Sequence, residues 1–217
     1  MIAIYEIGVR YFRDADAATA PAQVVAFALM QRFFLWFGAT GVMLPSLAVV
    51  GILLAAHIVR KDPWRPKPFL YVGMAVESLI LTAPLIALGM ALPQHLPVWS
   101  IHGPDAQWVV LAFGAGVYEE LVFRLIGVTL LVMLFSDVLR LPSKISIFAA
   151  VVLSAVGFSL YHYWGYEAFE WRSMVFRSAA GIYFGMLFIF RGFGITVGSH
   201  AAYDISILAL RHFAADV

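Results

Sequence analysis

Long apolar runs separated by short polar stretches make up most of the chain. A helix that spans a membrane needs about 20 mostly apolar residues, and a backbone in lipid must be helical or part of a closed barrel. The runs do not alternate between apolar and polar positions as barrel strands do, which favours helices. Six runs are long enough, at 41–59, 69–92, 107–137, 145–163, 173–190 and 193–211. We therefore predict an all-α fold, a polytopic transmembrane helix bundle.

Two runs are ambiguous. The run 21–38 carries Gln31 and Arg32 in its middle, so it is either a seventh span or an interfacial amphipathic helix. The run 107–137 exceeds one membrane thickness, so we expect it to tilt or to lie partly outside the lipid. The predicted number of spans is therefore six to seven.

The chain shows no internal repeat and no linker, so we predict that residues 1–217 form a single membrane-embedded domain. Residues 1–20 mix acids and bases where a cleaved secretory signal would have its apolar core. We interpret them as an interfacial or terminal segment.

Basic residues indicate the orientation of the bundle. Four residues of the loop 60–67 are Lys or Arg, whereas 93–106 contains neither. Short loops rich in Lys and Arg stay in the cytoplasm, so we place 60–67 there, and Arg140 and Lys144 fall on the same side. The charged residues of 164–170 are acids, which suits the outer interface. We expect an integral protein of the bacterial inner (cytoplasmic) membrane.

Composition agrees with this pattern and excludes several classes of function. The chain is 63% hydrophobic and only 12% charged, which is too apolar for a soluble domain. Its net charge of +1 gives no reason to expect nucleic-acid binding. It contains no Cys, so it has neither a disulfide framework nor a thiolate metal site.

Ionisable residues inside the predicted spans depart from the apolar pattern. An ionisable side chain at the centre of a membrane helix costs roughly 3 kcal/mol, so each one needs a partner or water. Residues i and i+4 share a helix face, so Glu120 can pair with Arg124 while Glu119 points about 100° away. One glutamate is thus neutralised by a structural ion pair, and the other is left free, either for chemistry or as a snorkelling or water-facing acid.

Two other predicted helices show the same spacing. Phe158 shares a face with His162, and His200 shares a face with Asp204. A carboxylate and an imidazole that face a polar cavity in an apolar interior form a water-activating pair. The pair His200 and Asp204 can present a donor to a developing oxyanion. Each histidine taken alone is more often a satisfied partner in an interhelical hydrogen bond, and the two are harder to dismiss together with Glu119.

These residues stand in three short motifs. They read "EELVFR" at 119–124, "FSLYH" at 158–162 and "HAAYD" at 200–204, all within the region 107–211. They resemble the EExxxR, FxxxH and HxxxN/D motifs of the CAAX-protease and bacteriocin-processing family of glutamic intramembrane proteases. Each pattern is short, but three in this order on separate predicted helices form a fairly specific signal.

The resemblance implies a helix bundle enclosing a polar cavity and an endopeptidase that uses neither metal nor cofactor. Its substrate would be a membrane-associated protein or peptide. By the motif positions, Glu119 would be the base, His162 would help to activate the water, and His200 with Asp204 would stabilise the oxyanion. The structural residues would be Glu120, Arg124 and Phe158. The prenyl-protein branch has Asn where this chain has Asp204, so a prenylated substrate is not implied.

Two other functions use the same residues. Glu119, His162, His200 and Asp204 offer the nitrogen and oxygen ligands of a zinc metalloprotease, which metal analysis and chelators would reveal. Alternatively, the buried acids and histidines belong to a non-enzymatic transporter or sorting scaffold. Transport predicts repeat symmetry or paired broken helices, and the sequence shows neither clearly.

Overall fold

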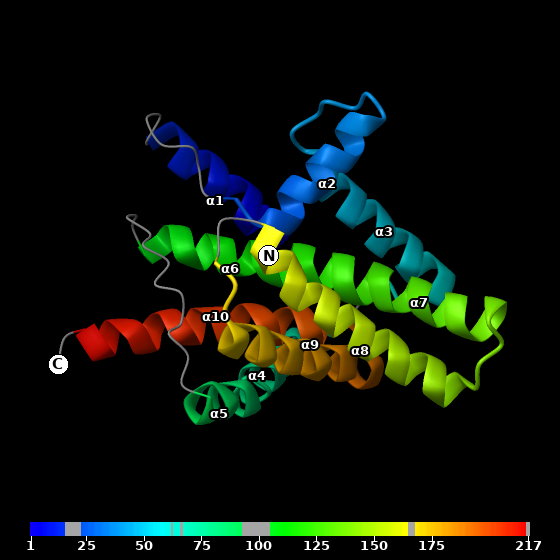
Figure 1. Cartoon of the computed structure of the whole chain (residues 1–217). Helices are drawn as coiled ribbons and strands as arrows, with labels where there is room; N and C mark the ends of the chain where they lie inside the picture. Colours follow the sequence, from blue (N-terminus) through cyan, green and yellow to red (C-terminus); the bar gives the residue numbers. More distant parts are fainter. Residues whose placement is uncertain (16–22, 62, 66, 93–104, 165–167, 216–217) are drawn as a thin grey trace.

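The computed structural model describes residues 1–15, 23–61, 63–65, 67–92, 105–164 and 168–215, and every regular element in these ranges is helical (Figure 1). The predicted all-α class is confirmed. The elements are α1 (Ile2–Ala15), α2 (Val25–Trp36), α3 (Leu44–Arg60), α4 (Pro68–Ile80), α5 (Ala83–Ala91), α6 (Asp105–Glu120), the π-helix η1 (Leu121–Val128), α7 (Thr129–Met133), the π-helix η2 (Leu134–Val138), α8 (Ser143–Tyr161), the 3-10 helix η3 (His162–Trp164), α9 (Trp171–Arg191) and α10 (Phe193–Ala215).

Five helical segments in the described part of the chain are long and apolar enough to cross a membrane. They are Pro68–Ala91, Ala106–Val138, Ser143–Trp164, Trp171–Arg191 and Phe193–Leu210, and they correspond to five of the six predicted runs. The protein is therefore an integral membrane protein.

The predicted run 41–59 gives a shorter helix than expected. It forms α3, which begins only at Leu44 with Pro45 in its first turn and has 17 residues. The helix α2, within the run 21–38, is shorter still at 12 residues. The structure thus supports five spans, and the predicted count of six to seven is not confirmed.

The first of the five spans is broken at its middle. Helix α4 ends at Ile80, and α5 begins at Ala83 with Pro84 in its first turn. Proline cannot continue a helix because it lacks an N–H and its ring clashes with the preceding turn. The hydroxyl of Tyr183 donates to the carbonyl of Leu81 at 2.7 Å, which satisfies an acceptor freed at the break.

The second span is a single rod of 33 residues whose hydrogen-bond pattern changes after Glu120. From Leu121 to Val128 the backbone forms a π-helix, a rare conformation that is often found at functional sites. The hydroxyl of Ser154 on α8 donates to the carbonyl of Phe123 at 2.6 Å and ties this π-helix to its neighbour.

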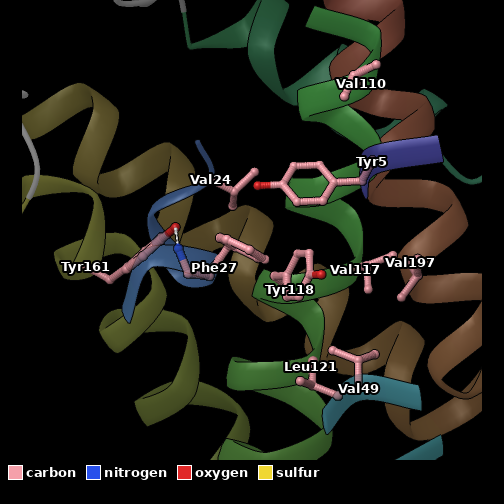
Figure 2. Close-up of a cluster of buried hydrophobic side chains, with 11 residues drawn as sticks. Tyr5, Val24, Phe27, Val49, Val110, Val117, Tyr118, Leu121, Tyr161 and Val197 are labelled. Atoms are coloured by element: carbon pink, nitrogen blue, oxygen red, sulfur yellow. Dashed lines mark hydrogen bonds between the residues drawn. The ribbon is translucent and has the colours of Figure 1, made fainter. Parts of the chain in front are cut away.

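The N-terminal helices pack against this rod and contribute to the core (Figure 2). Tyr5 of α1 is only 1% exposed, and its ring contacts Tyr118 and Phe27 edge-on at 5.3 and 5.5 Å. Gly114 makes room for it, because a Cβ there would lie 2.3 Å from the Tyr5 ring. One face of α1 is therefore buried, although residues 1–20 are predicted as an interfacial segment; residues 16–22 lie outside the described part.

Helices α8 and α9 approach each other closely where α9 carries Gly181 and Gly185. A Cβ added to Gly181 would lie 2.9 Å from the Cα of Ala155, so only glycine permits this approach. The spacing of these two glycines, four residues apart in "GIYFG", is typical of close helix packing in membranes. The close approach also brings the Gly181 carbonyl within reach of the site described next.

Candidate active site

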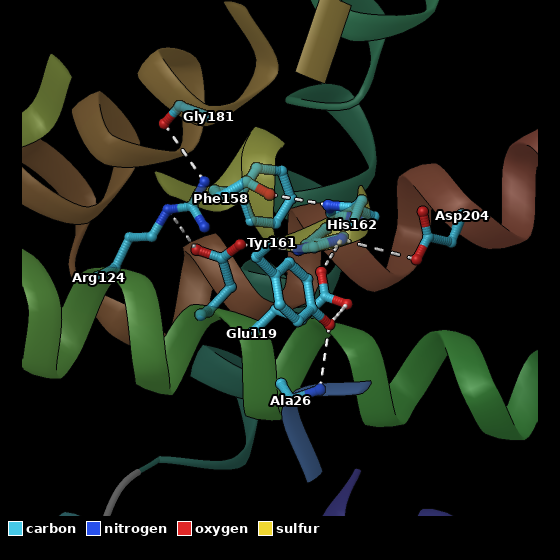
Figure 3. Close-up of polar contacts among 10 residues, drawn as sticks. Ala26, Glu119, Arg124, Phe158, Tyr161, His162, Gly181 and Asp204 are labelled. Carbon is cyan, nitrogen blue, oxygen red and sulfur yellow. Dashed lines mark hydrogen bonds and ion pairs between the residues drawn. The ribbon is translucent and has the colours of Figure 1, made fainter. Parts of the chain in front are cut away.

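The three motifs meet between α6, the end of α8 and α10 (Figure 3). Glu119 and Glu120 are the last two residues of α6, directly before the π-helix. His162 follows the last residue of α8 and opens the short helix η3. His200 and Asp204 lie one turn apart on α10, so their side chains share a face.

Glu119 is buried, at 6% exposure, and both of its oxygens face polar groups. Its Oε1 accepts a hydrogen bond from the Tyr161 hydroxyl at 2.9 Å. Its Oε2 lies 3.8 Å from Nε2 of His200. The carboxylate is therefore held on one side by a hydrogen bond and faces an imidazole on the other.

Glu120 connects Arg124 to His200. Its Oε2 lies 3.1 Å from Nε of Arg124, and the two side chains are 0% and 1% exposed. Its Oε1 accepts a hydrogen bond from Nδ1 of His200 at 2.7 Å. Because a carboxylate without its proton only accepts, the hydrogen on His200 Nδ1 is directed to Glu120. The other ring nitrogen, Nε2, then faces Glu119 and also Asp204, whose Oδ2 is 3.7 Å away.

Arg124 is surrounded by groups that suit a buried cation. Besides the contact with Glu120, its Nη2 donates to the carbonyl of Gly181 at 3.3 Å. Its guanidinium carbon lies 4.4 Å from the ring centre of Phe158 and 5.6 Å from that of Phe184. A buried charge is tolerated only when it is paired and hydrogen-bonded, and aromatic faces add further attraction.

Phe158 links Arg124 to His162. While its ring lies over the guanidinium, its carbonyl accepts a hydrogen bond from Nδ1 of His162 at 2.8 Å. The hydrogen of the neutral ring is therefore on Nδ1, and Nε2 carries the lone pair that can accept a proton. No hydrogen bond joins His162 to Glu119 in the described residues; Tyr161 lies between them, with its ring 4.7 Å from that of His162.

Two aromatic residues of the site are missing from the sequence prediction. Tyr161 stands next to His162 within "FSLYH", but tyrosines of membrane helices are commonly found at the lipid interface, so it gave no signal. Phe184 stacks on the His200 ring at 4.7 Å with an interplanar angle of 15°. Nothing in the sequence relates Phe184 to the motifs, because its contacts arise from the packing of α9 against α10.

Electrostatically, the site is an acidic group of side chains in an apolar surrounding. Three carboxylates and two imidazoles accompany a single guanidinium among the motif residues. Asp204 is the most exposed of the acids, with a third of its side chain (33%) accessible, whereas Glu119 and Glu120 are almost fully buried. Such a set is suited to moving protons. In the described residues, no group of three or more acids and histidines is arranged to hold a metal ion.

The part of the chain that carries the three motifs also matches a known family. Residues 103–206 match the family described as type II CAAX prenyl endopeptidase Rce1-like. This range includes all three motifs, and the family resemblance predicted from them is confirmed over these residues. No curated protein and no solved structure matches the chain.

Proposed function

With residues 103–206 matching the Rce1-like endopeptidase family, we propose that the protein is a glutamic-type intramembrane endopeptidase. Its substrate is a membrane-associated protein or peptide, and its location is the bacterial cytoplasmic membrane. The observation that supports this best is the contact set of Glu119, a buried carboxylate held by Tyr161 and facing His200.

In the proposed reaction Glu119 is the general base. It takes a proton from a water molecule, and the resulting hydroxide attacks the carbonyl carbon of the peptide bond. His162 assists through Nε2, the nitrogen not engaged by Phe158. The proton then passes to the departing amine as the carbon–nitrogen bond breaks. A carboxylic acid and an amine are released, and the side chains return to their starting state.

The oxyanion formed during attack is assigned to His200. Its Nδ1–H is engaged by Glu120, so only Nε2 of the protonated ring can donate to the oxyanion. An ionised Asp204 cannot donate a hydrogen bond. Its position 3.7 Å from Nε2 instead suits it to orient His200 and to balance the charge of the ring.

The test compares membrane-protein termini in cells that carry the wild-type protein with those that carry Glu119→Gln. Glutamine keeps the size of the side chain and the acceptor for Tyr161 but cannot take a proton from water. We expect at least one new terminus with the wild type and none with the variant. Glu77→Gln is the matched control, because Glu77 also lies on a spanning helix but pairs with Arg191, at 2.7 Å from Nη2. Full cleavage by Glu119→Gln would eliminate the mechanism.

A further inference from the structure

The hydroxyl of Tyr161 joins two parts of the chain that are far apart in sequence. It donates to Oε1 of Glu119 at 2.9 Å and accepts from the backbone N–H of Ala26 at 3.1 Å. Tyr161 is 3% exposed and Ala26 is fully buried. Ala26 lies outside residues 103–206, the part of the chain that matches the endopeptidase family, whereas Tyr161 lies within it.

The donor at Ala26 is available because of its place in α2. The first N–H groups of a helix have no partner within the helix. In α2, the residue before the helix, Val24, makes no side-chain cap, and Ala26 is the second helical residue. The Tyr161 hydroxyl therefore satisfies one of the free donors at the start of α2 (Figure 3).

This contact fixes the direction of the Tyr161 hydrogen. A backbone N–H can only donate, so the hydroxyl oxygen must accept from Ala26, and its own hydrogen is left for Glu119. The ring has little freedom to turn away, because it lies between Phe123, at 5.1 Å, and His162, at 4.7 Å. One oxygen of Glu119 is thereby held, and the other is left facing His200.

We propose that Tyr161, docked on the start of α2, is a positioning residue that sets the orientation of the Glu119 carboxylate for catalysis. The N-terminal helix α2 then contributes to the function of the site. This inference rests on the proposed function and deepens it, because it assigns the activity to residues inside the family match, Tyr161 and Glu119, together with Ala26 outside it.

The first test uses Tyr161→Phe, which keeps the ring and removes only the hydroxyl. The matched control is Tyr163→Phe, because the Tyr163 hydroxyl donates to the Glu170 carbonyl at 3.0 Å, away from Glu119.

The probe is a synthetic peptide that spans the cleavage site, which is identified from the terminus that only the wild type produces. The peptide is assayed with the full-length protein in liposomes. A hydrogen bond to a charged group is stronger than one between neutral groups, so its loss in Tyr161→Phe should lower kcat about tenfold or more. KM should stay as in the wild type, and the midpoint of the pH–activity profile should move. Tyr163→Phe should change none of these.

The second test removes the donor from α2. Ala26→Pro deletes the N–H, and the chain already accepts proline at the second helical residue in α3 (Pro45) and α5 (Pro84). We expect Ala26→Pro to lower kcat in the wild-type protein but to add little in the Tyr161→Phe background. Such non-additivity is the sign of two residues acting through one interaction.

The outcomes separate the two proposals. If the wild type cleaves the peptide and Tyr161→Phe cleaves it with the same kcat, the role of Tyr161 is overturned and the proposed function stands. Additive effects of Ala26→Pro and Tyr161→Phe would overturn the connection to α2. A wild-type protein whose cleavage does not depend on Glu119 would overturn the proposed function, and this inference with it.

Discussion

At the scale of single residues, one imidazole organises the acids of the site. Glu119 and Glu120 point about 100° apart on a helix, so the sequence predicts that they serve different partners. In the structure they approach opposite nitrogens of His200, Glu120 at Nδ1 (2.7 Å) and Glu119 at Nε2 (3.8 Å). The pairing of Glu120 with Arg124 is present as the i, i+4 spacing indicates, but the shared ring was not predictable, because it lies 80 residues further along the chain.

The pair Glu120 and Arg124 makes the first stability prediction. Both side chains are buried, and removing one partner of a buried ion pair leaves an uncompensated charge that costs about 3 kcal/mol or more. We expect Glu120→Gln to lower the unfolding temperature in detergent and the level of expression, because Arg124 loses its counter-charge. An unfolding temperature equal to that of the wild type, together with lost cleavage, would instead give Glu120 a direct part in the chemistry.

At the scale of helices, the sequence predicts where apolar segments lie better than where they break. Length and hydropathy are local properties, so five predicted runs correspond to the five spanning segments. Pro84 breaks the first of them, and the carbonyl of Leu81 at the break is satisfied by Tyr183, 102 residues away. A carbonyl of the π-helix that follows Glu120 is likewise satisfied by Ser154 of another helix. These two hydrogen bonds are tertiary contacts, which a periodic pattern does not encode.

The close approach of α8 and α9 makes a prediction at this scale. A Cβ at Gly181 would lie 2.9 Å from the Ala155 backbone, so Gly181→Ala must push the two helices apart. Overpacking of this kind costs about 1–3 kcal/mol. It would also move the Gly181 carbonyl that accepts from Arg124. We expect a lower unfolding temperature and reduced cleavage.

The control for this variant is Gly157→Ala on α8. There the nearest atom to an added Cβ is a ring carbon of Phe123 at 3.9 Å, an ordinary contact. Replacing a helical glycine by alanine without a clash favours the helix by about 0.5–1 kcal/mol, so this variant should be neutral or slightly stabilised. If the two alanine variants unfold at the same temperature, the packing described for α8 and α9 is wrong.

At the scale of the whole molecule, the motif region carries the candidate chemistry, but the N-terminal helices complete its surroundings. Tyr5 of α1 packs against Tyr118, which directly precedes Glu119, and α2 supplies the donor to Tyr161. The motifs predict which residues meet at the site, because the paired residues of each motif are four apart and share a helix face. They say nothing of α1 and α2, because the contact between Ala26 and Tyr161 spans 135 residues and involves a backbone atom.

The orientation of the bundle makes the last prediction, and the absence of Cys from the sequence provides the means to test it. Helix α8 has 19 residues, so at about 1.5 Å per residue it is close to the roughly 30 Å thickness of the hydrocarbon. Arg140 precedes α8 and Lys144 lies in its first turn, whereas the charged residues of 164–170 are acids, so we expect Ser143 in the cytoplasm and Ala168 outside. In Figure 1 the turn before α8 lies at the opposite end of the bundle from the C-terminus of α10.

Single substitutions Ser143→Cys and Ala168→Cys introduce one thiol at exposed positions on each side of α8. A membrane-impermeant maleimide added to intact spheroplasts should label Ala168→Cys and should reach Ser143→Cys only after the membrane is opened. The reverse pattern would invert the bundle, and labelling of both from one side would mean that α8 does not cross the membrane. Because His162 follows α8 directly, the expected pattern would place His162 at the outer end of α8.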